Sequence, residues 1–210
     1  SKTRLALEVN SSDDNDDGTC DATHCSLREA INYANSLPAG SVITFALAVG
    51  DWTITPQSAL PALTQIGATS VDGSVGSFPL TGKVTLSGSS AGDGAHGLII
   101  EGGNATISNL HIRGFDGLGL WLADGGNSTV RGCLIGLDQT GAAADYNMEG
   151  GIGVWSDGDT IGGTAAGEGN VVSGNIGAGG MLAGGGIEVT GDDAVILGNL
   201  VGTDVNGGSA

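Results

Sequence analysis

The sequence predicts an all-β solenoid, in which short strands stack coil upon coil along one axis. Three observations predict it: an internal repeat, 41 glycines, and short apolar runs rich in β-branched residues. Between Leu98 and Val205 an apolar triplet repeatedly leads through a Gly or Asn turn to a Thr-Ile or Thr-Val pair. Internal periods of roughly 20–50 residues are typical of solenoids. The repeat therefore indicates an architecture, although it says little about function.

The repeat is clearest where two segments align residue by residue. Residues 134–141 (LIGLDQTG) match residues 200–207 (LVGTDVNG), so Asp138 and Asp204 occupy equivalent places. The units restart after about 22 residues, or about 34 where an insertion intervenes. Residues 42–210 would then form about seven or eight coils, each burying one apolar face against the next.

Composition narrows the class of protein. Only 4 prolines accompany the 41 glycines, which excludes collagen and Pro-rich disorder. The 6 basic and 23 acidic residues give a net charge of −17, which argues against nucleic acid as a partner because phosphate binding needs clustered Lys and Arg. The acidity fits a soluble extracellular surface, calcium binding or a salt-rich habitat. No apolar run is long enough to span a membrane, so we expect a protein that is not membrane-spanning.

The first 41 residues differ from the rest. Alternating apolar residues predict a strand over 1–10, and an acidic loop follows over 11–25. Ser26 and Glu29 form a capping box that predicts a helix over 26–36, ended by Pro38. We expect residues 1–41 to form an N-terminal α-helical cap and residues 42–210 the coils. No comparable cap follows the last repeat, which predicts either a longer native chain or end-to-end self-association.

A resemblance to a known family sharpens this prediction. Residues 25–31 (CSLREAI), preceded by an Asp/Asn/Gly-rich loop with Cys20, resemble the signature of CSLREA-type bacterial surface β-helix proteins. Residues 161–163, 170–175 and 200–204 resemble their coil repeats, so the resemblance covers nearly the whole chain. It implies a right-handed parallel β-helix that is secreted or at the cell surface. It brings no established catalytic residues, and Cys133 stands where such coils often have Asn or an aliphatic residue.

The acidic loop carries a candidate calcium site. The pattern D-x-[DN]-x-[DN]-G, the first half of a calcium loop, begins at Asp13 and ends at Gly18. The twelfth position should be a bidentate Glu but is His24, and Glu29 replaces it only if the helix start folds across the loop. A solvated acidic turn is the alternative. The candidate ligands are Asp13, Asn15, Asp17, Thr19 and Asp21.

The three cysteines divide into a pair and a singleton. Cys20 and Cys25 are close enough to form a disulfide if the loop folds back, and such a bond would indicate an oxidising compartment. Cys133 lies in an apolar strand and reads as a buried small hydrophobe. Arg28 and Glu29 are expected to serve the helix structurally, with anion binding as the alternative role for Arg28.

Two tryptophans are candidate ligand contacts. Trp121 and Trp155 follow equivalent apolar pairs, so they could stack on one outer face and contact a cell-surface glycan or a protein. The alternative is that they pack beneath the insertions at 138–150 and 162–169. Asp138 and Asp204 could be catalytic, but a carboxylate repeated in successive coils more often accepts backbone N–H groups in a turn.

These observations favour a non-catalytic extracellular or cell-surface scaffold or adhesion module, stabilised by calcium if the acidic loop binds it. The alternative is a polysaccharide lyase or glycoside hydrolase, because that fold often carries such activities. An enzyme should show several carboxylates and a basic residue converging in a groove. A scaffold should show repeated carboxylates satisfied by backbone amides. We assign no catalytic residue.

Overall fold

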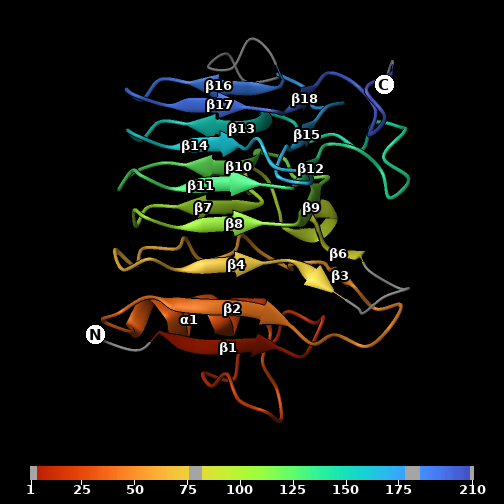
Figure 1. The fold of residues 1–210 in the computed structure, drawn as a ribbon. Coiled ribbons are helices and arrows are strands. Elements are labelled where there is room, and N and C mark those ends of the chain that lie inside the picture. The colour runs from red at the N-terminus through yellow and green to blue at the C-terminus, as the bar shows by residue number, and fades with distance from the viewer. Residues whose placement is uncertain (1–3, 76–81, 178–184, 209–210) are drawn as a thin grey trace.

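The computed structural model describes residues 4–75, 82–177 and 185–208 and consists mainly of short parallel strands stacked in three sheets (Figure 1). Sheet 1 contains, in order, β1 (Leu5–Val9), β2 (Ser41–Phe45), β4 (Ser70–Asp72), β8 (Thr106–Ser108), β11 (Thr129–Arg131), β14 (Thr160–Gly162) and β17 (Val195–Leu197). Sheet 2 contains β7 (Leu98–Ile100), β10 (Leu118–Leu122), β13 (Gly150–Val154) and β16 (Ile187–Val189). This arrangement is compatible with the predicted solenoid.

Sheet 3 completes the stack. It contains β3 (Thr53–Ile54), β6 (Gly82–Ser87), β9 (Leu110–Arg113), β12 (Leu134–Ile135), β15 (Val171–Val172) and β18 (Leu200–Val201). The short β5 (Ser74–Val75) pairs antiparallel with β6, and a 3₁₀ turn, η1 (Gly88–Ser90), follows β6. No helix in the described ranges is long and apolar enough to cross a membrane.

Equivalent residues of successive strands lie directly over one another in the interior. Ile107 of β8, Val130 of β11 and Ile161 of β14 share one register, and all three side chains are fully buried. Burying a Val, Leu or Ile side chain stabilises a fold by about 1.5–3 kcal/mol. Insertions such as residues 138–150 add residues between equivalent positions, so the separation of these positions in the sequence increases along the chain. The insertions leave the register of the strands unchanged.

The N-terminal residues take part in the same stack. β1 pairs in parallel with β2, so residues predicted as a separate segment contribute a strand to sheet 1. The predicted helix is present as α1 (Leu27–Ser36) and contacts β1 (Figure 1). Ser26 is its N-cap and forms the predicted capping box with Glu29. The helix buries Leu27, Ala30, Ile31 and Ala34 on one face.

One corner of the stack shows why Asn and Asp join Gly in the turns. Asn104, Asn127, Gly158 and Asp193 occupy equivalent places and all have positive φ. The backbone N–H of each of the first three donates to a carbonyl in the following coil, at 2.8, 2.9 and 2.8 Å. Asn and Asp tolerate the left-handed conformation better than other non-glycine residues. The corner therefore continues the backbone ladder between sheets 2 and 1.

Candidate functional site

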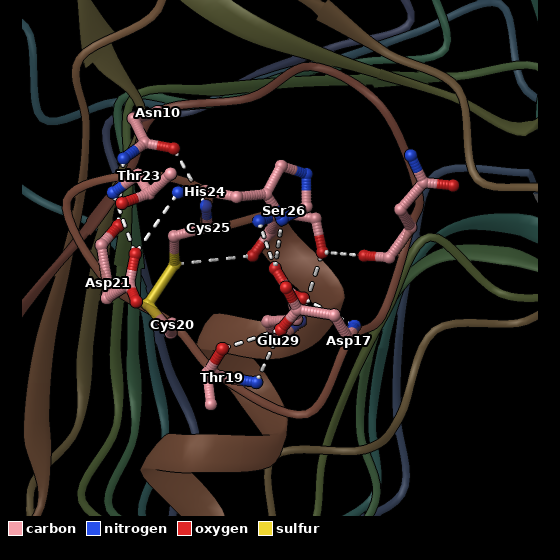
Figure 2. The surroundings of a disulfide bond; sticks show 11 residues. Asn10, Asp17, Thr19, Cys20, Asp21, Thr23, His24, Cys25, Ser26 and Glu29 are labelled. Carbon is pink, nitrogen blue, oxygen red and sulfur yellow. Dashed lines mark hydrogen bonds and ion pairs between the residues drawn. A yellow bond between two sulfur atoms is a disulfide. The ribbon is translucent and has the colours of Figure 1, made fainter.

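A disulfide closes the acidic loop, and an asparagine holds the loop against the end of β1. Cys20 and Cys25 are bonded as predicted (Figure 2). Asn10, directly after β1, accepts a hydrogen bond from the backbone N–H of Cys25 at 2.7 Å and donates to the carbonyl of Asp21 at 3.0 Å. The loop therefore closes through covalent and polar contacts with its own neighbours.

Glu29 links the helix to the acidic loop. This contact is the condition that the sequence set for Glu29 to replace the missing Glu at the twelfth position of a calcium loop. Its side chain is only 1% exposed. Oε2 accepts from the Ser26 backbone N–H at 2.7 Å, and Oε1 accepts from the Asp17 backbone N–H at 2.8 Å. A carboxylate that satisfies two backbone donors fixes both the helix start and the loop.

His24 joins two acidic groups of the loop. Its Nε2 lies 3.0 Å from Oδ1 of Asp13, and its Nδ1 lies 3.0 Å from Oε2 of Glu29. The hydrogen bond with Asp13, followed by the charge of Glu29, raises the pKa of His24 above its ordinary value. The sequence identified His24 only as a poor calcium ligand. Its role as a bridge depends on how the loop folds back.

Most predicted calcium ligands are engaged in short local turns. Oδ1 of Asp13, of Asp17 and of Asp21 accepts from the backbone N–H two residues later, at 3.1, 2.9 and 2.7 Å. Such Asx turns stabilise a bent backbone without an ion. The hydrogen bonds from Thr19 lower the pKa of Asp17, and the backbone donor at Thr23 lowers that of Asp21. These carboxylates are therefore stabilised in their charged form.

The structure brings together a different set of groups from the one predicted. Among the described residues, Asp17, His24 and Glu29 place one ligand atom each within 4.8 Å of one another. Of the five predicted ligands, only Asp17 belongs to this cluster. Calcium takes six to eight oxygen ligands, and an imidazole nitrogen does not suit it. The arrangement does not by itself form a calcium cage, and calcium binding stays a prediction.

Arg28 acts structurally, as expected. Its guanidinium binds the carboxylate of Asp14 through two hydrogen bonds, of 3.0 and 2.8 Å. It also donates to the carbonyls of Ser58 and Ala59, both at 3.0 Å. The arginine therefore ties the acidic loop to the segment that follows β3.

The repeated carboxylates are satisfied by their own turns. Oδ1 of Asp138 accepts from the backbone N–H groups of Thr140, Ala142 and Ala143, each at 3.2 Å. Oδ1 of Asp204 accepts from the N–H groups of Asn206 and Gly208, at 2.8 and 2.9 Å. This is the pattern expected for a structural carboxylate.

The basic side chains of the repeats are also engaged. Arg113 is paired with Asp145, and Arg131 lies 3.2 Å from Glu168. Lys83 donates to the carbonyl of Gly132 at 2.6 Å. Each of these three cations therefore has one local partner. A lyase would instead need a basic residue beside several clustered carboxylates.

Cys133 is buried as predicted. It is 1% exposed, and burial raises the pKa of its thiol to about 11. Its backbone N–H donates to the side-chain oxygen of Asn170, whose Nδ2 donates in turn to Asn199, both at 2.9 Å. Cys133 thus lies where an asparagine ladder between coils ends.

The two candidate tryptophans meet, although not in the way predicted. Trp121 faces Gly153 in the register of β10 and β13, and Trp155 comes two residues later, so they are not equivalent. Their rings nevertheless pack edge to face, with centroids 4.7 Å apart. Glycine at position 153 leaves room for this packing, because a Cβ there would lie only 2.9 Å from Leu118 and 3.4 Å from Trp121. His96 packs on the same Trp121 ring at 5.0 Å.

Trp155 also borders a pocket of ≈ 370 Å³ at the corner between sheets 2 and 1. The other lining residues are Asp124, Gly125, Gly126, Asn127, Ser156 and Asp157. Both aspartates are exposed. Sequence reasoning found the tryptophan but missed the polar lining, because those residues come from two turns that only the stacking of coils brings together.

Comparison of the chain with known protein families and with curated proteins found no match.

Proposed function

We propose that this protein is a non-catalytic extracellular or cell-surface scaffold, an adhesion module that presents turns and loops along a stack of coils. One observation supports this proposal most strongly. Asp138 and Asp204, which are equivalent in the repeats, each accept hydrogen bonds from the backbone amides of their own turn. A carboxylate used in this way stabilises a turn and is poorly placed to exchange protons with a substrate.

The proposal includes a right-handed parallel β-helix with α1 as part of its N-terminal cap. Three parallel sheets in one register support the β-helix. The apolar face of α1, together with its contacts to β1, supports the cap. Covering a terminal strand in this way prevents its edge from pairing with another chain.

The proposed location outside the cell rests on the Cys20–Cys25 disulfide, because such bonds persist in oxidising compartments. The charge of −17 adds support, since a highly charged surface favours the solubility of a secreted protein. We propose a cell-surface glycan or protein as the partner. End-to-end self-association is a further proposal, supported by the exposed apolar side chains of β17 and β18.

The decisive experiment is incubation of the full chain with acidic and neutral polysaccharides, with calcium or with EGTA. We expect neither new reducing ends nor unsaturated products. A matched variant is Asp138→Asn, which keeps the Oδ1 acceptor and should leave the melting temperature nearly unchanged. Product release by the wild type that Asp138→Asn abolishes would replace the scaffold with a polysaccharide-active enzyme. Product release that this variant leaves intact would also refute the scaffold and would place the reaction elsewhere.

A further inference from the structure

We propose that the corner pocket beside Trp155 binds a neutral glycan, with the indole as its apolar wall and Asp124, Asn127 and Asp157 as its polar side. This proposal rests on the proposed adhesive function and names the chemistry of its partner. The site joins the turn after β10 to the turn after β13, so two successive coils are needed to form it.

The wall of the pocket presents hydrocarbon. Trp121 and Trp155 are both partly exposed. In the part of the chain that the structure describes, neither Nε1 atom has a hydrogen-bond partner, and both are inaccessible to solvent. Whatever part of either indole is exposed is therefore ring carbon, and of the two it is Trp155 that lines the pocket. Such a surface matches the C–H face of a pyranose ring, which is apolar although the rim of the sugar carries hydroxyl groups.

The wall is also held rigidly. Trp155 packs edge to face on Trp121, and His96 also packs on Trp121. His96 is itself oriented, because its Nδ1 accepts from the backbone N–H of Leu118 at 2.8 Å. A preorganised aromatic side chain loses little conformational entropy when a ligand binds.

The polar side can accept hydroxyl groups. Oδ1 of Asp157 accepts from the Asp192 backbone N–H, and Oδ1 of Asp124 accepts from that of Gly125, both at 2.7 Å. These bonds engage one oxygen of each exposed carboxylate, so the other oxygen is available as an acceptor. Hydrogen bonds from a hydroxyl to a carboxylate are charge-assisted and short. The amide of Asn127 supplies both a donor and an acceptor.

The charge of the pocket selects among glycans. Its lining contains two aspartates and no Lys or Arg, and the chain carries a net charge of −17. A uronic acid or a sulfated sugar would meet like charges, so a neutral hexose polymer fits best. A cationic ligand would also be attracted to the two carboxylates and to the indole face, so the test below includes a basic probe that distinguishes it from a neutral glycan.

The test is isothermal titration calorimetry of the full chain with soluble neutral glucans, mannans and galactans. Polygalacturonate and a polylysine peptide serve as acidic and basic probes. We expect binding to at least one neutral polymer, with affinity nearly independent of salt because salt screens interactions between charges and a neutral polymer carries none. Trp155→Ala should lower that affinity at least about tenfold. Trp155→Phe, which keeps a ring, should lose less, and Asp157→Asn should weaken binding without abolishing it.

Two control variants lie away from the pocket. Tyr33→Ala removes an exposed aromatic side chain of α1, and Asp93→Asn neutralises an exposed carboxylate. Both should bind as the wild type does, and thermal melts verify that every variant is folded. Binding that is unchanged in folded Trp155→Ala and Trp155→Phe would overturn the proposal. So would the lack of neutral binding, or binding to polylysine alone that salt abolishes. Glycan binding without product would leave the scaffold intact, whereas product release would refute the scaffold separately.

Discussion

The two ends of sheet 1 differ in how their outermost strands are covered. At the N-terminal end, Leu7 and Val9 of β1 are only 4% and 0% exposed. They belong to one hydrophobic core with Cys25 of the acidic loop and Leu27 of α1. A disulfide, a capping box and the buried Glu29 hold that covering in place.

At the other end the same kind of side chain is exposed. Ile196 of β17 is 46% exposed, although it lies in register with the fully buried Ile161. Sheet 3 shows the same contrast at this end: Val201 of β18 is 48% exposed, whereas its neighbour in register, Val172 of β15, is fully buried. Residue type and register are alike within each pair. Burial in this fold is therefore decided by whether another layer lies against a strand.

The sharpest test of that contrast compares two isoleucines in one column. Ile161→Ala should lower the free energy of unfolding by about 2–5 kcal/mol, because it leaves a cavity in a closed core. Ile196→Ala should cost less than about 1 kcal/mol, since much of that side chain already faces solvent. Urea denaturation followed by circular dichroism measures both. Equal losses would show that the exposed end is covered in solution.

The next test removes the link that holds the N-terminal covering. Glu29→Ala should destabilise the protein by about 1–3 kcal/mol, because it leaves the backbone N–H groups of Ser26 and Asp17 without an acceptor. Glu8→Ala, on the exposed face of β1, is the control and should change stability by less than about 0.5 kcal/mol. Hydrogen exchange should locate the loss of protection in residues 10–36. A loss spread evenly over all coils would contradict a local role.

Calcium should have a smaller effect on the same end. If the acidic loop binds it, the melting temperature should rise by roughly 2–4 °C in calcium relative to EGTA, which corresponds to about 1 kcal/mol in a chain of this size. Asp17→Asn keeps the Oδ1 acceptor for Thr19 but removes the charge, so it should abolish the rise. The same melting temperature with calcium and with EGTA would show that the loop closes through its own hydrogen bonds.

The smallest expected effect is a pH dependence at His24. Its pKa is raised in the folded protein, chiefly by the hydrogen bond with Asp13. The folded state thus binds the proton more tightly than the unfolded state. The resulting stability is fully present below the unfolded value of about 6.5 and is lost as the pH rises through the folded value.

Melting curves of the wild type and of His24→Gln at several pH values isolate this contribution. The advantage of the wild type should shrink as the pH rises from about 6 to 8. His111 should behave oppositely, because burial lowers its pKa, so its contribution is present above about 6.5 and falls as the pH drops through its folded value. An advantage of the wild type over His24→Gln that does not change with pH would contradict the assigned bridge.

The sequence predicted the parts of the candidate sites that depend on local patterns. Ser26 and Glu29 identified the helix start, and the spacing of Cys20 and Cys25 allowed their disulfide. The Asx turns at Asp13, Asp17 and Asp21 were not predicted as such, because the same spacing is shared by calcium loops and by simple acidic turns. Which of the two forms depends on where the rest of the loop lies.

The repeat determined by itself that strands would stack in one register, because apolar residues at a fixed place in each coil can be buried only by neighbouring coils. Tertiary structure alone decided that Trp155 would border a pocket with Asp124, and that Glu29 would reach Asp17. It also decided that Ile161 would be buried and Ile196 exposed. The physical reason is that these outcomes depend on contacts between residues that are not neighbours in the sequence. A local sequence pattern does not specify how close such residues lie in space.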